Sequence, residues 1–511
     1  MKVISIGTDR KIFAKDSAVR RRAVKYGEFF EEMHVIVFSK RNHKHSDFRY
    51  QISNKIFAYP TNSKSGFFYI WDAFRIGKTL KSNIKNSSCV VSGGDPFETG
   101  AVGVLLKLFF NLPLHIQVHT DLMNKYFSQL SLLNRIRFFI AEFILRYSDR
   151  VRAVSERVGK SISPFSKSID ILPIKMEIEE RNYESVKKPF PFTLLMVCRL
   201  EKEKNIETVF RAVKTVKNKD IGLCIVGDGS QKNNLENVAK NMGISEKIIF
   251  AGWQNNLAPY YKMADIFVSA SLYEGYGISI MEAAYFGKPL ILSETGIAGD
   301  IFKENESAFV CDAKDSACFA KNILEIYKDK DLAQKMGQLA KISADKHLIS
   351  EKNYFKEYAD SIIKTAANFK ERNFISRIIN FKITAFRSIR FLRYFICGII
   401  SAAVNIILLY IFTDIWSIWY LYSSIFAFLI ALIVSFNLQK FVVFKDGNTD
   451  GLHRQFSKFF IAAVLGVISN TILVYVFTDI INVWYIFSQI IAGIFVMVQN
   501  FILYRFFIFN K

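Results

Sequence analysis

The C-terminal part of this chain contains two copies of one apolar hairpin, offset by 65 positions. Residues 391–444 align with residues 456–509 at roughly 20 identities in 54 positions. A repeat of this kind marks a duplicated structural unit. The identities include polar and aromatic positions, such as Asn405 with Asn470 and Trp419 with Trp484. The repeat predicts a membrane module, whereas the first 370 residues have the character of a cytosolic enzyme.

Four apolar segments of the length that crosses a bilayer are predicted at 393–412, 419–438, 459–477 and 484–503. Lys and Arg lie before the first, between the second and third, and after the fourth, but are absent from the connections 413–418 and 478–483. The positive-inside rule then puts both termini in the cytoplasm. The apolar run at residues 1–7 is too short for a signal peptide, which agrees with a cytoplasmic N-terminus. We expect a multi-pass protein of the cytoplasmic (inner) membrane with its enzyme domain in the cytoplasm.

Each copy contains two crossings, so the second copy has the same topology as the first, a parallel repeat of the sort found in transporters. Asn405 and Asn470 lie mid-segment at equivalent depth, where an amide needs a hydrogen-bond partner. They either bond the helices together or contact a substrate.

Two aromatic and basic signatures end the second and fourth segments, SFNLQKFVVF at 435–444 and NFILYRFFIF at 500–509. With the four spans they resemble those of GtrA-like proteins. That resemblance implies an all-α transmembrane four-helix domain built from two parallel two-helix repeats, in a family implicated in moving polyprenyl-phosphate-linked sugars across the bilayer. The first signature has Lys440 where Arg is commoner, and Lys binds phosphate as a point charge, not bidentately.

Composition narrows the class of protein further. A chain of 511 residues exceeds the size of one core, so two or three domains are expected. Its net charge of +22 suits an anionic membrane surface or reflects a generally basic exterior. No zinc-finger or RNA-binding signature accompanies the charge, so no nucleic-acid partner is expected. The six cysteines are scattered without a C-x2-C pair and are predicted to be reduced core residues.

Residues 1–368 alternate short apolar runs with helical patterns, as doubly wound parallel sheets do. One series of runs ends near 172, and a second begins at 192 after a polar stretch. We predict an α/β fold of two Rossmann-like domains, 1–185 and 186–368, which face a cleft with a ligand at the carboxyl ends of their strands. A basic amphipathic linker is expected at 369–390, either lying on anionic lipid or acting as a packed connector, before the transmembrane domain at 391–511.

The second domain contains the chemically informative residues. Arg199 ends a predicted strand and Lys204 precedes a helix, so both suit a diphosphate. Gly227 ends the next strand and leaves room for a nucleotide. The strongest local signal is EGYGISIME at 274–282, whose glycines let backbone amides approach a sugar or phosphate. Glu282 can reach ribose hydroxyls and Glu274 sugar hydroxyls.

Together these residues resemble glycosyltransferase family 4, the retaining enzymes of the GT-B fold. The resemblance covers most of the second domain and, more weakly, the loops at 92–100 and 118–121 of the first. It implies that residues 1–185 form the acceptor side and that residues 186–368 bind the nucleotide sugar. Arg199 and Lys204 would then stabilise the departing diphosphate, Glu282 would hold the ribose and Glu274 the donor sugar, with His119 near the anomeric carbon. The remaining donor-binding positions are Gly227, Gly275, Tyr276, Gly277 and Ile278. Asn205 stands where the family usually has Gly after the Lys.

The leading hypothesis is therefore a membrane-bound retaining glycosyltransferase that acts from a nucleoside-diphosphate sugar on a polyprenyl-phosphate-type lipid or a cell-envelope glycan. Its fused module would translocate the lipid-linked sugar or anchor the enzyme. The alternative is a polyprenyl-linked sugar translocase whose other domains only bind sugar nucleotide or scaffold partners. No cofactor or metal is expected. The D-x-D lookalike at 329–331 lies in a charged helical run, and the calcium-loop lookalike at 446–451 lacks its final glutamate.

Overall fold

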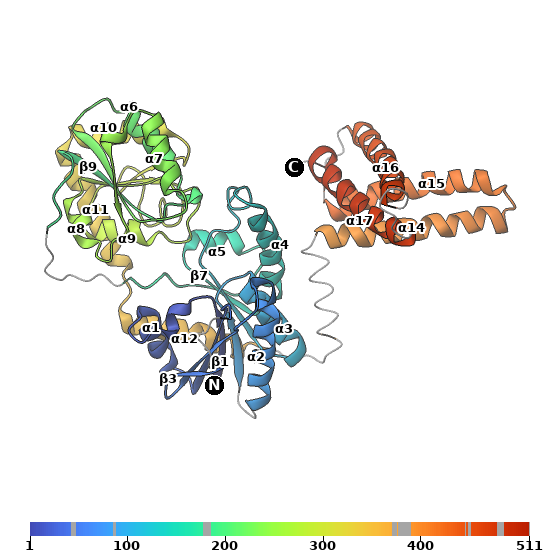
Figure 1. The fold of residues 1–511 in the computed structure, drawn as a ribbon, viewed down its shortest axis with the longest axis horizontal. Coiled ribbons are helices and arrows are strands. Elements are labelled where there is room, and N and C mark those ends of the chain that lie inside the picture. The colour runs from blue at the N-terminus through green and yellow to red at the C-terminus, as the bar shows by residue number, and fades with distance from the viewer. Residues whose placement is uncertain are drawn as a thin grey trace. The chain divides into compact units, whose positions relative to one another are not determined.

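The computed structural model describes residues 1–41, 48–84, 88–176, 185–369, 376, 390–444, 446–447, 451–477 and 485–509. It divides into two units, Met1–Ile378 and Ile379–Lys511, which we describe separately. The first unit contains two sheets with helices packed on them (Figure 1). The predicted amphipathic linker falls almost wholly outside the described residues and stays a prediction.

The first sheet has eight strands in the order β3-β4-β2-β1-β5-β6-β7-β8, and every pairing except β3 with β4 is parallel. Its strands are β1 (Lys2–Gly7), β2 (Glu32–Val37), β3 (Tyr50–Ser53), β4 (Ile56–Pro60), β5 (Cys89–Gly93), β6 (Leu114–Val118), β7 (Arg150–Ala153) and β8 (Ile169–Ile171). The helices that connect them are α1 (Ala18–Gly27), α2 (Tyr69–Asn83), α3 (Glu98–Phe110), α4 (Leu132–Tyr147) and α5 (Glu156–Ile162). Buried Val and Ile side chains fill the inner strands, as a sheet covered on both faces requires.

The second sheet has six parallel strands in the order β11-β10-β9-β12-β13-β14. These are β9 (Phe192–Val197), β10 (Ile221–Val226), β11 (Ile248–Gly252), β12 (Ile266–Ser269), β13 (Leu290–Ser293) and β14 (Phe309–Cys311). Its helices are α6 (Ile206–Thr215), α7 (Lys232–Asn241), α8 (Ala258–Met263), α9 (Ile278–Tyr285), α10 (Ser316–Lys328) and α11 (Lys330–His347). The reversal of strand order beside β9 marks the edge where a ligand binds in such sheets.

The last helix of the first unit, α12 (Glu351–Ala367), returns from the second sheet to the first. Tyr354, Phe355, Tyr358 and Ile362 of this helix join the hydrophobic core formed with β1, β2 and α1. Figure 1 shows α12 beside α1 in the first domain, far in sequence from the strands β5, β6 and β7 that it contacts. The first domain is therefore completed by residues that follow the second.

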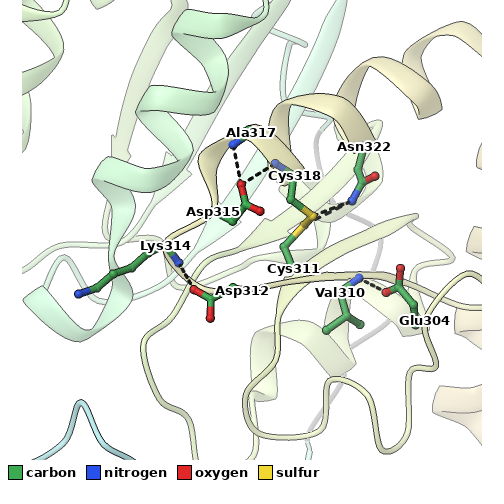
Figure 2. The surroundings of a disulfide bond; sticks show 9 residues. All are labelled: Glu304, Val310, Cys311, Asp312, Lys314, Asp315, Ala317, Cys318 and Asn322. Atoms are coloured by element: carbon green, nitrogen blue, oxygen red, sulfur yellow. Dashed lines mark hydrogen bonds between the residues drawn. A yellow bond between two sulfur atoms is a disulfide. The ribbon is translucent and has the colours of Figure 1, made fainter.

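The prediction that all six cysteines are reduced is wrong for two of them. Cys311 at the end of β14 and Cys318 in the first turn of α10 form a disulfide with their Cα atoms 6.0 Å apart (Figure 2). Asp315 caps α10 by accepting from the backbone N–H groups of Ala317 and Cys318, which turns the helix start toward the strand. A separation of seven residues across this turn brings the sulfurs together, a pairing that a search for C-x2-C spacing does not detect.

The second unit is helical. It comprises α14 (Arg390–Tyr410), α15 (Tyr420–Asn437), α16 (Leu452–Tyr475) and α17 (Tyr485–Leu503), with α14 packed on α15 and α16 on α17. Two stretches, Phe426–Val443 and Leu452–Leu473, are long and apolar enough to cross a membrane by length and composition, and shorter apolar helices cover Arg393–Leu408 and Ile491–Leu503. Asn405 and Asn470 are both half-buried.

Both sequence signatures contain a wide π-helical turn, η6 (Leu438–Val443) and η8 (Tyr504–Ile508). The turns occupy corresponding positions in the two repeats. Lys440 of the first turn is fully buried, and its ammonium donates to Asp446 at 3.0 Å and to Gln455 at 2.7 Å. The sequence suggested that the Lys440 ammonium contacts a phosphate, but in the structure this charge already binds protein groups. Asp446 of the calcium-loop lookalike is one of these partners.

Candidate functional site

All ten residues singled out in the sequence line one cavity of about 520 Å³. The cavity lies at the carboxyl ends of β9 and β10 and at the loop before α9, with His119 of the first domain contributing to its wall. The set comprises Arg199, Lys204, Glu274, His119, Glu282, Gly227, Gly275, Tyr276, Gly277 and Ile278. Their catalytic and binding roles remain predictions, but the structure does bring them together. We call this space the donor cavity.

The most closely coupled pair in the donor cavity is Lys204 with Glu274. The Lys204 ammonium forms an ion pair with Glu274 Oε1, which also accepts from the Ser271 hydroxyl at 2.9 Å. Both charged side chains are mostly buried. Arg199 instead keeps a mostly exposed guanidinium, anchored by one bond of 3.2 Å to Glu203. The arrangement offers one positioned and one mobile cation to an anionic ligand.

Asn205 follows Lys204 at a position where the family that the chain resembles usually has Gly. Its backbone has φ 50°, a left-handed conformation that favours Gly and that Asn tolerates. The side-chain amide donates to Ala270 O at 3.0 Å and to Ala313 O at 2.5 Å. Asn205 thus keeps the conformation that Gly would allow and adds a tie between the Lys204 turn and two neighbouring loops.

Gly275 and Gly277 meet two different requirements. A Cβ on Gly275 would overlap the carbonyl group of His119, so only Gly allows the loop to approach the first domain this closely. Gly277 has φ 100° and precedes α9, which begins at Ile278. The free N–H groups of this helix start, together with its dipole, open toward the cavity wall formed by Gly277, Ile278 and Ser279.

Glu282 lies one turn into α9 and is half-buried beside Tyr261, whose hydroxyl donates to Glu282 Oε2 at 2.6 Å. Burial raises the pKa of the Glu282 carboxyl, and the bond from Tyr261 partly opposes that rise. The sequence did not indicate Tyr261, because its position on α8 relative to α9 depends on packing. The carboxylate has one oxygen held by protein and faces the cavity.

His119 separates the donor cavity from a second cavity of about 330 Å³ in the first domain, because it lines both. Its Nε2 lies 3.3 Å from Gln117 Oε1, and its ring keeps a solvent-accessible side. Atoms crowding the cleft, helped by the Arg152 guanidinium, lower the pKa of His119 below its usual value. The imidazole is therefore neutral at physiological pH.

The second cavity, which we call the acceptor cavity, was not predicted in detail; its lining includes the cations Arg22, Arg152 and Lys175 and the carboxylates Asp9 and Asp95. Arg152 is 2% exposed and donates to Leu172 O at 3.1 Å, Pro173 O at 2.9 Å and the Tyr354 hydroxyl at 3.1 Å. None of these groups carries a charge. Arg22 is half-buried at the same cavity, and neither arginine has a carboxylate partner among the described residues. A buried positive charge without a counter-ion favours an anionic ligand.

Two residues of the first domain tie it to the donor loops. Ser155 caps α5 and donates its hydroxyl hydrogen to Gly275 O at 2.7 Å. Arg157 donates to Gly296 O at 3.2 Å and to Ala298 O at 2.8 Å. These bonds hold the donor loop against His119. Neither residue stood out in the sequence, since a Ser that starts a helix and a surface Arg are ordinary features.

Comparison with known proteins identifies two families within the chain. Residues 177–342 match the model described as glycosyl transferases group 1, and residues 393–509 match the GtrA/DPMS transmembrane domain. The first match contains every second-domain residue of the donor cavity from Val197 to Glu282. The second contains both aromatic signatures.

Curated relatives are similar to part of this chain. N-acetyl-alpha-D-glucosaminyl L-malate synthase of Bacillus anthracis is 29% identical over 43% of this chain and 60% of its own length. UDP-Gal:alpha-D-GlcNAc-diphosphoundecaprenol alpha-1,3-galactosyltransferase of Escherichia coli is 29% identical over 34% of this chain and 45% of its own. The chain thus spans only about half the length of such relatives.

Among solved structures, sucrose-phosphate synthase from Thermosynechococcus elongatus superposes with a TM-score of 0.57 at 17% identity, over 72% of this chain and 100% of that one. At this identity the likeness concerns the fold, two Rossmann-type domains in the GT-B arrangement. The chain thus has a GT-B-like fold in its first unit, a region at 177–342 that is similar to group 1 glycosyltransferases, and a region at 393–509 that is similar to the GtrA/DPMS transmembrane domain.

Proposed function

We propose that this protein is a retaining glycosyltransferase of family 4 type that transfers a sugar from a nucleoside diphosphate to a polyprenyl-phosphate-type lipid or a cell-envelope glycan. The observation that carries the proposal is the convergence of Arg199, Lys204, Glu274 and Glu282 on one cavity whose wall includes His119. The transmembrane domain translocates the lipid-linked product or anchors the enzyme at the cytoplasmic face of the inner membrane.

In this scheme the bond between the anomeric carbon and the diphosphate oxygen breaks. The acceptor oxygen forms a bond to the same face of that carbon, and its proton passes to the departing diphosphate. The cations Lys204 and Arg199 stabilise the charge that grows on the leaving group. Glu282 accepts hydrogen bonds from the ribose, and Glu274 both orders Lys204 and contacts the sugar. The neutral His119 packs beside the anomeric carbon without adding a charge there.

The charge of the acceptor cavity supports an anionic acceptor. Arg152 and Arg22 place positive charge beside His119, where an acceptor must lie to reach the donor sugar. The names of two relatives specify acceptors that are anions, a malate and a diphosphoundecaprenol conjugate. A phosphate or diphosphate group on the acceptor would find its counter-charge here.

The proposal is tested by a screen of nucleotide sugars with the full chain in native membranes and a polyprenyl-phosphate acceptor. One donor is expected to yield a glycolipid with the anomeric configuration of the donor, as read by proton NMR. Glu282→Ala and Lys204→Ala are expected to abolish most of that transfer. An inverted product would rule out the retaining mechanism. Full transfer by both variants would instead favour a translocase whose cavity only binds nucleotide.

A further inference from the structure

The first domain exposes a group of aromatic and basic side chains where the η2 turn (Gly66–Phe68) runs into α2. Phe67, Phe68 and Trp71 are 88%, 43% and 59% exposed, which is unusual for side chains of this size. Arg75 and Lys78 are exposed one and two turns further along the helix. No ion-pair partner is recorded for either cation within the described part of the chain. We call these five residues the α2 face.

Helical geometry puts the α2 face on one side of the element. Positions 67, 71, 75 and 78 are separated by four, four and three residues, so they project in nearly the same direction. Trp71 contacts Phe74 with ring centroids 6.0 Å apart, and Phe74 in turn contacts Phe109 at 5.6 Å. The exposed rings thus stand on an ordered aromatic base and do not belong to a loose loop.

The helix that bears the α2 face contacts the loop that lines the acceptor cavity. Tyr69, between Phe68 and Trp71, stacks on Phe38 with centroids 5.2 Å apart and accepts a hydrogen bond of 3.2 Å from Arg10. The two residues before Arg10, Thr8 and Asp9, line the acceptor cavity. The reason is topological, because β1 and β4 are both parallel to β2 and the loops after them emerge at the same edge of the sheet.

We infer that the α2 face binds the surface of an anionic lipid bilayer and holds the mouth of the acceptor cavity at the head-group level. Tryptophan and phenylalanine combined with Lys and Arg on one helix face is the composition of interfacial helices. A bilayer is close at hand, since the apolar helices of the second unit, beginning with Arg393–Leu408, follow the first unit in the chain. Because those helices tether the first unit to the bilayer, the α2 face meets the lipid surface at a high effective concentration.

The use of this contact for acceptor delivery rests on the proposed function, but the contact itself does not. A lipid-linked acceptor has its polar head at the same depth as the α2 face. An enzyme held there meets the head group directly, whereas an enzyme free in solution must first extract the lipid.

A fluorescence experiment on the full chain in nanodiscs tests the contact without any substrate. The dye NBD is attached to Phe67→Cys in discs of phosphatidylethanolamine and phosphatidylglycerol, with Ile342→Cys as the matched control. Ile342 is 62% exposed on α11 of the second domain. The unsubstituted chain gives the background labelling of its native thiols. Emission from position 67 is expected to shift to the blue and to be quenched by nitroxide lipids, while position 342 retains the spectrum of a dye in water.

Charge reversal identifies the lipid charge as the cause. Arg75→Glu with Lys78→Glu is expected to lower the bilayer-bound fraction at position 67, each lost charge reducing surface partitioning roughly fivefold at low salt. In discs of phosphatidylcholine alone, which have no net charge, the bilayer-bound fraction at position 67 is also expected to fall.

Two results would overturn the inference. One is a spectrum at position 67 that matches position 342. The other is a blue shift without quenching by nitroxide lipid, which would show that protein, such as the segment 370–389 or a second copy, covers the face. Lipid quenching in a chain that transfers no sugar would leave the inference standing and count against the proposed function alone.

Discussion

Replacing Gly275 by Ala tests whether the contact between donor loop and His119 is required for transfer. The new Cβ would overlap the His119 carbonyl group and lie 3.1 Å from the Cα of Thr120. Both obstacles are backbone atoms, which cannot rotate away as a side-chain tip can. The loop and the first domain must therefore separate by about 1 Å or more, a misplacement that costs on the order of 10²-fold in rate. That factor corresponds to about 2.7 kcal/mol of transition-state free energy.

The assay is kcat/KM for sugar transfer in membranes, together with nucleotide affinity from titration calorimetry. Gly275→Ala is expected to lose about 10²-fold in kcat/KM while nucleotide binding changes little, because Lys204 and Glu282 stay in place. Gly103→Ala is the matched control, since its Cβ would clash with the tip of the Leu114 side chain and otherwise make only an ordinary contact with the Val91 side chain. It should lower thermal stability without changing the rate. Transfer by Gly275→Ala within threefold of the unsubstituted chain would refute the reasoning.

Three further predictions concern pH, the disulfide and the acceptor. Burial raises the pKa of Glu282 above its value in the unfolded chain, so the folded state holds the proton more tightly. The free energy of unfolding therefore falls as pH rises from about 4.5 through the folded pKa. Glu282→Gln should flatten that part of a profile of melting temperature against pH, and an unchanged profile would contradict the assignment. Cys318→Ser opens a ring of eight residues and should cost roughly 2.5 kcal/mol of unfolding free energy by chain entropy, an effect that dithiothreitol should reproduce in the native chain but not in the variant. Arg22→Gln should raise KM for a phosphorylated acceptor about tenfold, because a charge-assisted hydrogen bond is lost, while KM for the donor stays unchanged. The control Arg21→Gln, at the exposed neighbouring position, should have no effect on either constant. Equal acceptor KM values for Arg22→Gln and the native chain would show that Arg22 is not part of the acceptor site.

The donor side could be read from the sequence because its signals are local. Gly275, Gly277, Glu274 and Glu282 lie within nine positions, and a strand end followed by a helix start fixes where their side chains and amides gather. The parallel sheets were equally accessible, since buried strands form continuous apolar runs. The strands β3 and β4 did not stand out in the sequence, because β3 is an edge strand that mixes polar and apolar residues and β4 ends at Pro60.

The acceptor side could not be read in this way because it is assembled over long distances. Arg152 meets Tyr354 across two hundred positions, through the return of α12 to the first sheet. The disulfide was missed for a related reason, since it depends on the turn between β14 and α10 and not on a spacing motif. Asn205 shows the opposite case, in which an apparent departure from a family pattern preserves the backbone conformation.

The central claim is that the donor cavity catalyses sugar transfer onto a membrane lipid. The most direct measurement is incorporation of radiolabelled sugar from the preferred nucleotide sugar into the organic extract of membranes that contain the full chain. We expect labelled lipid with the native protein, and with Lys204→Ala a loss of about 2 to 4 kcal/mol of transition-state stabilisation, which is about 30- to 10³-fold in rate. Equal labelling by Lys204→Ala, or labelled sugar recovered only in the aqueous phase, would contradict it.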